Sequence, residues 1–309
     1  MNVLVVSGDR NQPRLSIKEL PKPMPGAGEV LIRIVAAGVM PSELGWPSTW
    51  TTRSGAARVD TVPSHEFSGR VQALGSNVPH LQVGDEVFGM NDWYSDGAMA
   101  EYCIAPAAGL AFKPRTLSHS ESAAVPISAL TAFQALFEHA RVAANERVLV
   151  LGAAGSVGSF VVQLAAQHGC SVIGVASASD FAFVQGLGAA QVVDYQLDAF
   201  KGALAPVDVI VDTVGGELFR RAQAVCKPDG RLVTVASSSE NSADERQAEI
   251  FFIVKPSHAQ LSEMAAMFDL GRLRAFVKRA VTLSEAAEEY LVPTKGKAYG
   301  KTVAQVVAT

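Results

Sequence analysis

The sequence has 309 residues, of which 49% are hydrophobic, so the chain is long enough for two domains with buried cores. A formal net charge of −4 and the lack of a long basic run argue against nucleic-acid binding through phosphate contacts. No apolar run approaches the roughly 18 residues that span a bilayer, and the N-terminus lacks the features of a signal peptide. We therefore expect a cytoplasmic protein with no membrane partner. The three cysteines are scattered and fit neither a disulfide framework nor a zinc cluster.

The first third of the chain is typical of a β-rich domain. Short apolar runs at residues 30–35, 69–74 and 86–89 alternate with Pro- and Gly-rich turns. No long helical pattern begins before about residue 119.

The pattern changes from residue 120, where Ala, Leu and Phe recur at helical spacing as far as residue 143. Strands and helices are then expected to alternate, which predicts a parallel, doubly wound sheet. The strands expected are 147–151, 171–175, 207–212 and 231–236, and the helices are 157–168, 181–187 and 217–225. After them we expect a buried strand at 251–254, a helix at 259–270 and strands at 277–281 and 301–307. The sequence thus predicts a β-rich domain, an inserted nucleotide-binding domain and a tail that rejoins the first domain.

A glycine-rich turn at residues 152–158 gives the strongest local signal. The apolar run RVLVL leads directly into Gly152, Gly155 and Gly158, and an apolar-faced helix follows. Gly155 lets the backbone approach a pyrophosphate, Gly158 lets the helix pack on the strand, and the helix N-terminus favours the negative charge. Because it stands between a strand and a helix, this turn predicts a dinucleotide-binding site.

The end of the next strand bears on the choice of cofactor. NAD-binding folds place a carboxylate about 20 residues after the glycines to bind the ribose hydroxyls. Here the strand ends in ASAS, with Ser177, and no carboxylate ends it. This favours NADP over NAD, although no Arg or Lys follows at once and Asp180 has the wrong charge for a phosphate. Tyr195 is a second candidate hydroxyl near that phosphate.

Several motifs in a fixed order then identify a family resemblance. They are GEVLIRIVAAGV, PSHEFSGRVQALGSNV, VGDEVFGM, GAMAEYCIAP, AVPISALTAFQAL, GAAGSVG, LGAAQVVDY, VDTVGG, KPDGRLVTVAS and YGKTVAQV. With them the chain resembles a zinc-independent medium-chain dehydrogenase/reductase of the quinone-oxidoreductase-like, or zeta-crystallin-like, branch.

The resemblance implies an α/β fold in which a GroES-like β-rich barrel, residues 1–125 and 256–309, carries an inserted Rossmann domain, residues 126–255. It also implies an active site between the two domains and a homodimer formed near the Rossmann sheet edge, close to residues 251–254. The residues that the resemblance implies as cofactor contacts are Thr131, Gly152, Gly155, Ser156, Val157, Gly158, Ser177, Tyr195, Thr213, Val214, Ala236, Ser237, Phe252, Ile253 and Lys301.

Zinc-dependent members of the family hold a catalytic metal with Cys, His and a second Cys. In this chain Met40 and Ile127 stand at the positions of the two cysteines, and of the metal ligands only the pair His65-Glu66 remains. A four-cysteine lobe is also absent. A catalytic zinc needs three protein ligands, so we expect no metal. Without a Lewis acid, hydride transfer from NADPH suits a quinone or an α,β-unsaturated carbonyl compound, because such acceptors delocalise the negative charge.

The segment GVMP departs from the GVNP of many relatives, which removes a polar active-site group. The candidates that remain for proton delivery are Ser42, Tyr94 and His65. The residues expected to line the pocket of a flat, apolar substrate are Met40, Trp46, Trp50 and Trp93.

Two alternatives stay open from the sequence. An enoyl-thioester or acrylate-type reductase would need basic residues at the rim of its substrate cleft. Arg53 and Arg58 are the candidates for this rim. Alternatively, the chain is a non-catalytic NADPH-binding structural or regulatory protein, since some family members, the lens crystallins among them, serve as NADPH-binding structural proteins.

Overall fold

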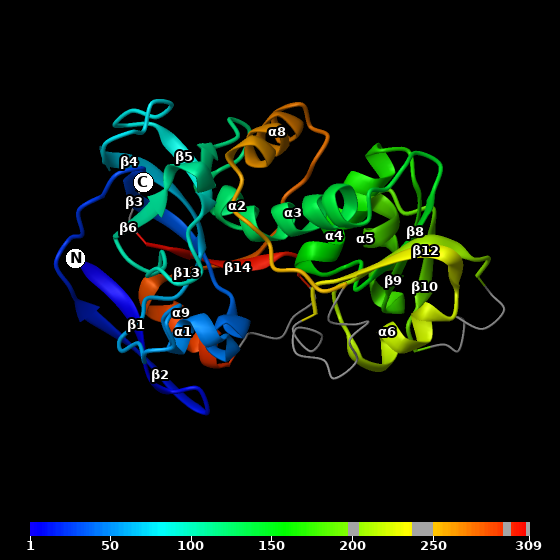
Figure 1. The fold of residues 1–309 in the computed structure, drawn as a ribbon, viewed down its shortest axis with the longest axis horizontal. Helices are drawn as coiled ribbons and strands as arrows, with labels where there is room; N and C mark the ends of the chain where they lie inside the picture. The colour runs from blue at the N-terminus through cyan, green and yellow to red at the C-terminus, as the bar shows by residue number, and fades with distance from the viewer. Residues whose placement is uncertain (197–203, 237–249, 293–297, 307–309) are drawn as a thin grey trace. The chain divides into compact units, whose positions relative to one another are not determined.

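The computed structural model describes residues 1–196, 204–236, 250–292 and 298–306. The chain divides into two compact units (Figure 1). Unit 1 comprises Met1–Ile127 and Pro256–Thr309, and unit 2 comprises Ser128–Lys255.

Unit 1 is built on an extended antiparallel sheet. Its strand order is β13-β14-β3-β4-β5-β7, with β6 paired to β3, and only the pair β13-β14 is parallel. The hairpin β1-β2 stands beside it, and the buried run Val3–Val6 of β1 joins the hydrophobic core of the unit. The strands are β1 (Asn2–Asp9), β2 (Gln12–Glu19), β3 (Glu29–Gly38), β4 (Glu66–Leu74), β5 (Glu86–Met90), β6 (Tyr102–Pro106), β7 (Leu110–Phe112), β13 (Val277–Thr282) and β14 (Lys301–Gln305).

The tail of the chain returns to this sheet, as the sequence predicts. Strand β14 lies antiparallel to β3, with Val303 opposite Gly38. Two helices of the unit begin with a reciprocal capping box, Ser118 with Glu121 and Thr282 with Glu285. The helical segments are η1 (Pro41–Gly45), α1 (Pro47–Trp50), η2 (Ala107–Gly109), α2 (His119–Ala123), α8 (His258–Asp269) and α9 (Leu283–Leu291).

Unit 2 contains a five-stranded parallel sheet in the order β10-β9-β8-β11-β12. The strands are β8 (Arg147–Leu151), β9 (Ser171–Ala176), β10 (Gln191–Asp194), β11 (Val207–Asp212) and β12 (Cys226–Thr234). The chain winds outward in one direction through β9 and β10 and then in the other through β11 and β12. The carboxyl ends of β8 and β11 therefore form the switch point at which such sheets bind ligands.

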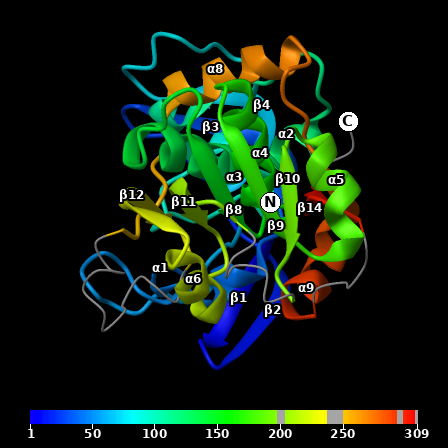
Figure 2. The same ribbon diagram turned by 90° about the vertical axis from the view of Figure 1, so that its right-hand side faces the viewer.

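Helices pack against both halves of this sheet. Helices α4 and α5 contact the strands β8 to β10, and α6 contacts β11 (Figure 2). The helical segments are α3 (Pro126–Phe133), the π-helical turn η3 (Gln134–His139), α4 (Ser156–Gln167), η4 (Ala178–Asp180), α5 (Phe181–Gly186) and α6 (Gly216–Gln223).

The structure corrects the sequence prediction in several places. Strand β12 spans Cys226–Thr234, where a strand at 231–236 was expected. Residues 251–254 do not form a strand: Phe251 makes one isolated parallel bridge to Thr234. Strand β10 and helix α9 were not expected from the sequence. Among the described residues no helix is long and apolar enough to cross a membrane.

Candidate functional site

The glycine turn of unit 2 has the geometry that dinucleotide binding requires. Gly152 has φ +74°, which favours glycine, and a Cβ there would lie 2.5 Å from Thr213 Oγ1. A Cβ on Gly158 would lie 2.1 Å from the Gly152 carbonyl oxygen, so only glycine lets α4 pack this closely on the turn. Gly155 differs, because a Cβ there would meet only the Gly152 oxygen, at 3.1 Å, and would otherwise enter open space.

That open space lies where α4 begins. Gly155 is exposed and precedes the first helical residue, Ser156, while Val157 is partly exposed and Gly158 is buried. The N–H groups of a first helical turn lack partners within the helix and carry partial positive charge. A cradle without a side chain in front of such N–H groups fits the pyrophosphate of a nicotinamide dinucleotide.

A buried carboxylate that sequence reasoning missed organises the neighbouring strand ends. Asp212, the last residue of β11, accepts the N–H groups of Val214 and Gly215, both at 2.9 Å, and the hydroxyl of Thr234 at 2.6 Å. Thr234 in turn accepts the Ala236 N–H at 3.2 Å. The predicted cofactor residues Val214 and Ala236 are thus held at the carboxyl edge of the sheet by one side chain.

Thr213 lies at the same edge, where its hydroxyl donates to the Leu151 carbonyl at 2.8 Å. Val214 is 51% exposed, so its side chain is available for contact. Ser237, predicted to follow Ala236 in the cofactor site, lies outside the described residues.

The tip of β9 carries a carboxylate after all, although not on the strand itself. The Ser177 hydroxyl donates to Asp180 at 2.5 Å and lies 2.8 Å from the Ser179 hydroxyl. Tyr195 is brought to the same tip, because its N–H donates to the Ala176 carbonyl at 3.4 Å. Ser177 and Tyr195 therefore lie at the same strand end, and the carboxylate of Asp180, already noted in the sequence, is bound to Ser177.

A side chain in the π-helical turn holds the segment that contains Phe252 and Ile253. Gln134 donates to the Lys255 carbonyl at 2.8 Å and accepts the Lys255 N–H at 3.0 Å. Phe252 is buried and stacks on His139 at 4.0 Å between ring centroids, whereas Ile253 is exposed. The Gln134 side chain therefore fixes the end of this segment, and Ile253 is turned outward. Thr131, on α3, is buried.

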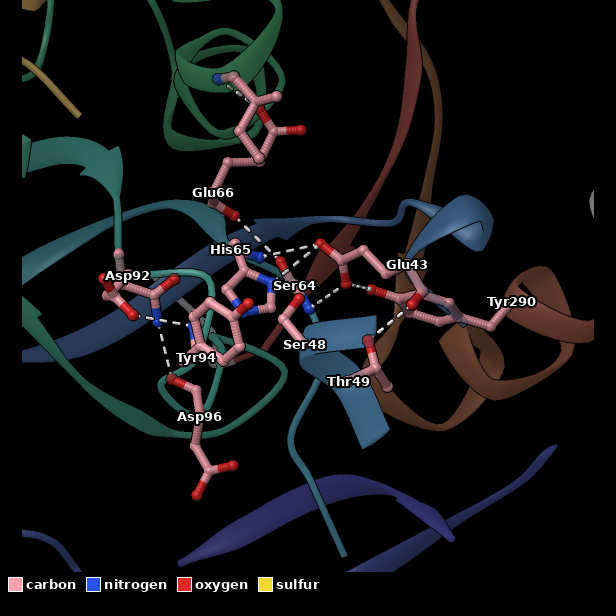
Figure 3. Close-up of polar contacts among 12 residues, drawn as sticks. Glu43, Ser48, Thr49, Ser64, His65, Glu66, Asp92, Tyr94, Asp96 and Tyr290 are labelled. Carbon is pink, nitrogen blue, oxygen red and sulfur yellow. Dashed lines mark hydrogen bonds and ion pairs between the residues drawn. The ribbon is translucent and has the colours of Figure 1, made fainter. Parts of the chain in front are cut away.

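Unit 1 contains a second polar centre, built around Glu43 of η1 (Figure 3). The carboxylate is fully buried and accepts the Ser64 N–H at 2.7 Å and the His65 N–H at 3.2 Å. It also lies 3.2 Å from His65 Nδ1 and accepts the hydroxyl of Tyr290, from α9, at 3.3 Å. Burial and the neighbouring Glu43 carboxylate raise the pKa of Tyr290 well above its usual value, so Tyr290 remains a donor.

His65 is buried, and its Nε2 atom has no hydrogen-bond partner. Trp93 lies against the imidazole, with ring centroids 5.3 Å apart, and Trp46 meets Trp93 edge-on at 5.0 Å. Two of the predicted pocket tryptophans are thus brought together with a predicted catalytic residue. Trp50 packs instead on the core of unit 1, and its indole N–H donates to the Leu44 carbonyl at 2.8 Å.

The other predicted residues of this unit lie around the same centre. Met40 is partly exposed, and its carbonyl accepts the Glu43 N–H at 3.0 Å. Ser42 is exposed on η1. Tyr94 is 37% exposed, and the Arg53 guanidinium lies over its ring, 4.6 Å from the centroid.

Both arginines considered for a basic rim form ion pairs with acidic residues of one loop. Arg53 pairs with Asp92, and Arg58 pairs with Asp96 at 3.0 Å. Their charge is therefore largely neutralised, which does not favour a rim for an anionic carrier.

Lys301 lies in unit 1, where it forms a buried ion pair with Glu66. Glu66 also accepts the Ile127 N–H at 3.0 Å. Burial raises the pKa of Glu66, and Lys301 opposes this effect.

These contacts test whether the chain fits the zinc of its metal-dependent relatives. The two cysteine positions hold Met40 and Ile127, Glu66 is already paired with Lys301, and His65 is the one imidazole at this centre. Among the described residues no three His, Cys, Asp or Glu side chains form a metal-binding group. This donor set does not fit a tetrahedral catalytic zinc.

Comparison with known proteins agrees with the resemblance inferred from the motifs. Residues 26–115 match the alcohol dehydrogenase GroES-like domain, and residues 187–303 match the domain family described as zinc-binding dehydrogenase. The chain is 30% identical over 286 residues to 2-methylene-furan-3-one reductase from Solanum lycopersicum, covering 89% of this chain and 71% of that protein. The chain belongs to the medium-chain dehydrogenase/reductase family.

Two further relatives place it with quinone-oxidoreductase-like members. A chloroplastic quinone oxidoreductase from Triphysaria versicolor is 27% identical over 312 residues, covering 93% of this chain and 92% of that protein. The solved structure of the quinone oxidoreductase from Coxiella burnetii superimposes with a TM-score of 0.87 at 27% identity, over 99% of each chain. The expected fold, a GroES-like domain with a Rossmann domain, is thereby confirmed.

Proposed function

We propose that this oxidoreductase reduces a quinone or an α,β-unsaturated carbonyl compound with NADPH and without zinc. The observation that carries the proposal is the glycine turn, whose open cradle at Gly155 stands at the switch point of a parallel sheet. When bound, NADPH would supply the hydride from its nicotinamide ring. Relatives named for quinone and enone reduction support the substrate class.

The chain's own residues bind and orient the cofactor. Gly155, Ser156 and Val157 would hold the pyrophosphate, and Ser177 and Tyr195 would lie near the 2′-phosphate of the adenosine. The remaining proposed contacts are Thr131, Gly152, Gly158, Thr213, Val214, Ala236, Ser237, Phe252, Ile253 and Lys301.

Substrate selection follows from a donor set that does not fit zinc. Reduction of a simple ketone leaves a localised alkoxide, which a metal stabilises well. A quinone or enone leaves a delocalised anion, which hydrogen-bond donors alone stabilise. Met40, Trp46 and Trp93 are the proposed walls for such a flat acceptor, whereas Trp50 packs on the core of unit 1.

The experiment follows NADPH absorbance with 1,4-benzoquinone, a linear enone and a simple aldehyde, each with and without a chelator. We expect oxidation with quinone or enone, unaffected by chelator, and none with aldehyde. The matched control is Gly155→Val, which fills the cradle and should abolish NADPH binding. Loss of activity with chelator and recovery with zinc would overturn the proposal. NADPH binding without turnover would favour an enoyl-thioester substrate or the non-catalytic alternative.

We further propose a cytoplasmic homodimer that forms at the edge of the Rossmann sheet, near residues 251–254. Strand β12 ends the five-stranded sheet, and Phe251 bridges to its Thr234. Light scattering on the purified protein tests the assembly.

A further inference from the structure

The unpartnered nitrogen of His65 is the starting point. His65 Nε2 is buried and has no hydrogen-bond partner, whereas Nδ1 faces the Glu43 carboxylate at 3.2 Å. A buried polar atom without a partner is energetically costly, so such atoms in a folded protein call for an explanation. A ligand atom that binds to Nε2 and completes its hydrogen bonding is one such explanation.

Glu43 fixes how this imidazole is oriented. Its two oxygens accept the Ser64 and His65 N–H groups and the Tyr290 hydroxyl, so the carboxylate cannot rotate without breaking buried hydrogen bonds. A carboxylate acceptor at Nδ1 requires a proton on that nitrogen. Nε2 is then left to exchange a proton with a ligand, and the carboxylate stabilises the imidazolium when both nitrogens are protonated.

We propose that His65 is the catalytic proton donor to the substrate oxygen, with Glu43 and Tyr290 as positioning residues. This inference rests on the proposed quinone or enone reduction. As the acceptor gains a hydride from NADPH, negative charge develops on its oxygen. The Nε2–H bond of the imidazolium breaks, an O–H bond forms on the substrate, and the neutral imidazole then regains a proton from water. One hydride and one proton are thus added for each NADPH oxidised.

The surrounding charges suit this role. The groups that act on the centre are Glu43 from η1, Tyr290 from α9 and, next along β4, Glu66 paired with Lys301. The ion pair of Glu66 and Lys301 is neutral overall, so Glu43 is left to balance a charged His65. The exposed alternatives Ser42 and Tyr94 have no comparable fixed partner for the side-chain oxygen among the described residues.

Trp93 lies beside this imidazole, with ring centroids 5.3 Å apart, and is itself partly exposed. The edge-on contact with Trp46 leaves aromatic surface on which such an acceptor can stack.

The first test compares acceptors whose reduced anions differ in basicity. General acid catalysis matters most when the anion is basic, and contributes about 10²- to 10⁴-fold. For His65→Gln we expect kcat/KM to fall about 100-fold with a linear enone or a methylated benzoquinone. With a chlorinated benzoquinone, whose anion needs no prompt protonation, we expect a loss under about 10-fold, after subtraction of the uncatalysed rate. Glu43→Gln should show the same difference in kcat/KM loss between the acceptors, and Tyr290→Phe should show a smaller difference.

The second test does not depend on turnover. In ¹⁵N-histidine-labelled protein, the His65 resonances are assigned by their loss in His65→Gln. We expect neutral His65 to carry its proton on Nδ1, and Glu43→Gln to move it toward Nε2. A phenolate added as an oxyanion analogue should shift the Nε2 resonance in wild-type protein.

His119→Gln is the matched control, because His119 is also paired with a carboxylate, Glu86 at 3.4 Å, and a hydroxyl, Ser68 at 2.8 Å. It should change neither the acceptor trend nor NADPH affinity. Wild-type-like turnover by His65→Gln, or an equal loss with every acceptor, overturns the inference and leaves the proposed function standing. Absence of turnover by wild-type protein overturns both. NADPH affinity, measured for each variant, shows that the variant is folded.

Discussion

Lys301 and Glu66 form a buried ion pair that joins strands far apart in the sequence, β14 and β4, within unit 1. Glu66 is fully buried, and Lys301 is 9% exposed. Because two charges are removed from water together, each depends on the other for its stability. The tail of the chain is therefore anchored by a charge as well as by the pairing of β14 with β3.

Replacing Lys301 with Met tests this anchor. The change leaves the Glu66 carboxylate buried without its counter-charge, which typically costs about 3–5 kcal/mol. Burial already raises the pKa of Glu66 above its usual 4.5, and loss of Lys301 raises that pKa further. A carboxyl group whose pKa is raised in the folded state contributes stability that is lost as pH rises. The deficit in thermal stability should therefore be larger at pH 8 than at pH 5.

Differential scanning calorimetry at the two pH values provides the measurement. The double variant Glu66→Gln/Lys301→Met is the control, since it removes both charges and should lose the pH dependence. A single variant equally destabilised at both pH values would contradict the explanation.

The glycines of the turn should respond differently to the same small change. Gly158→Ala puts a methyl group 2.1 Å from the Gly152 oxygen, so both stability and NADPH binding should fall. Gly155→Ala puts it into the open cradle, so binding should weaken, by about 10-fold or more, while the melting temperature stays close to that of wild-type protein. Fluorescence titration and thermal melting of the pair separate the two effects, and a Gly155→Ala protein that binds NADPH normally would argue against the cradle.

Asp180 should influence the choice between NADPH and NADH. Its carboxylate already accepts the Ser177 hydroxyl that a 2′-phosphate would use, and it repels that phosphate. Asp180→Asn keeps the size of the side chain and removes the charge. We expect the ratio of NADPH to NADH affinity to rise about 10-fold, which corresponds to about 1.4 kcal/mol. Equilibrium titration with both dinucleotides measures the ratio, and Ser179→Ala, which leaves the charge in place, should change it little.

The sequence predicted the Rossmann unit closely because its signals are local. Strands β8 and β11 begin and end where the apolar runs do, at 147–151 and 207–212, and the glycine spacing marks the turn between strand and helix. The centre at Glu43 has no such signal. Glu43 is separated from His65 by 22 residues and from Tyr290 by 247, and only the folded sheet brings them together. An acidic residue in the proline-bounded segment MPSELGWP was the one available hint.

The segment at residues 251–254 shows why an apolar run is ambiguous. Four apolar residues predicted a buried strand, yet only Phe251 pairs, through one bridge. The backbone groups of Lys255, just beyond the run, are satisfied by the Gln134 side chain instead of by a neighbouring strand. A polar side chain 121 residues away in the sequence is not visible to a pattern of hydrophobicity.

Gln134→Leu should therefore weaken binding at the nicotinamide end of the cofactor. The change removes both hydrogen bonds to Lys255 and keeps a similar volume, so the segment with Phe252 and Ile253 loses its fixed position. If these residues present backbone to the nicotinamide, NADPH affinity should fall about 10-fold, or about 1.4 kcal/mol, the size expected for one or two lost hydrogen bonds. Affinity for 2′,5′-ADP, which lacks the nicotinamide, should stay unchanged and serves as the control ligand. An equal loss for both ligands would show that Gln134 supports the whole unit, and no loss for either would place the nicotinamide away from this segment.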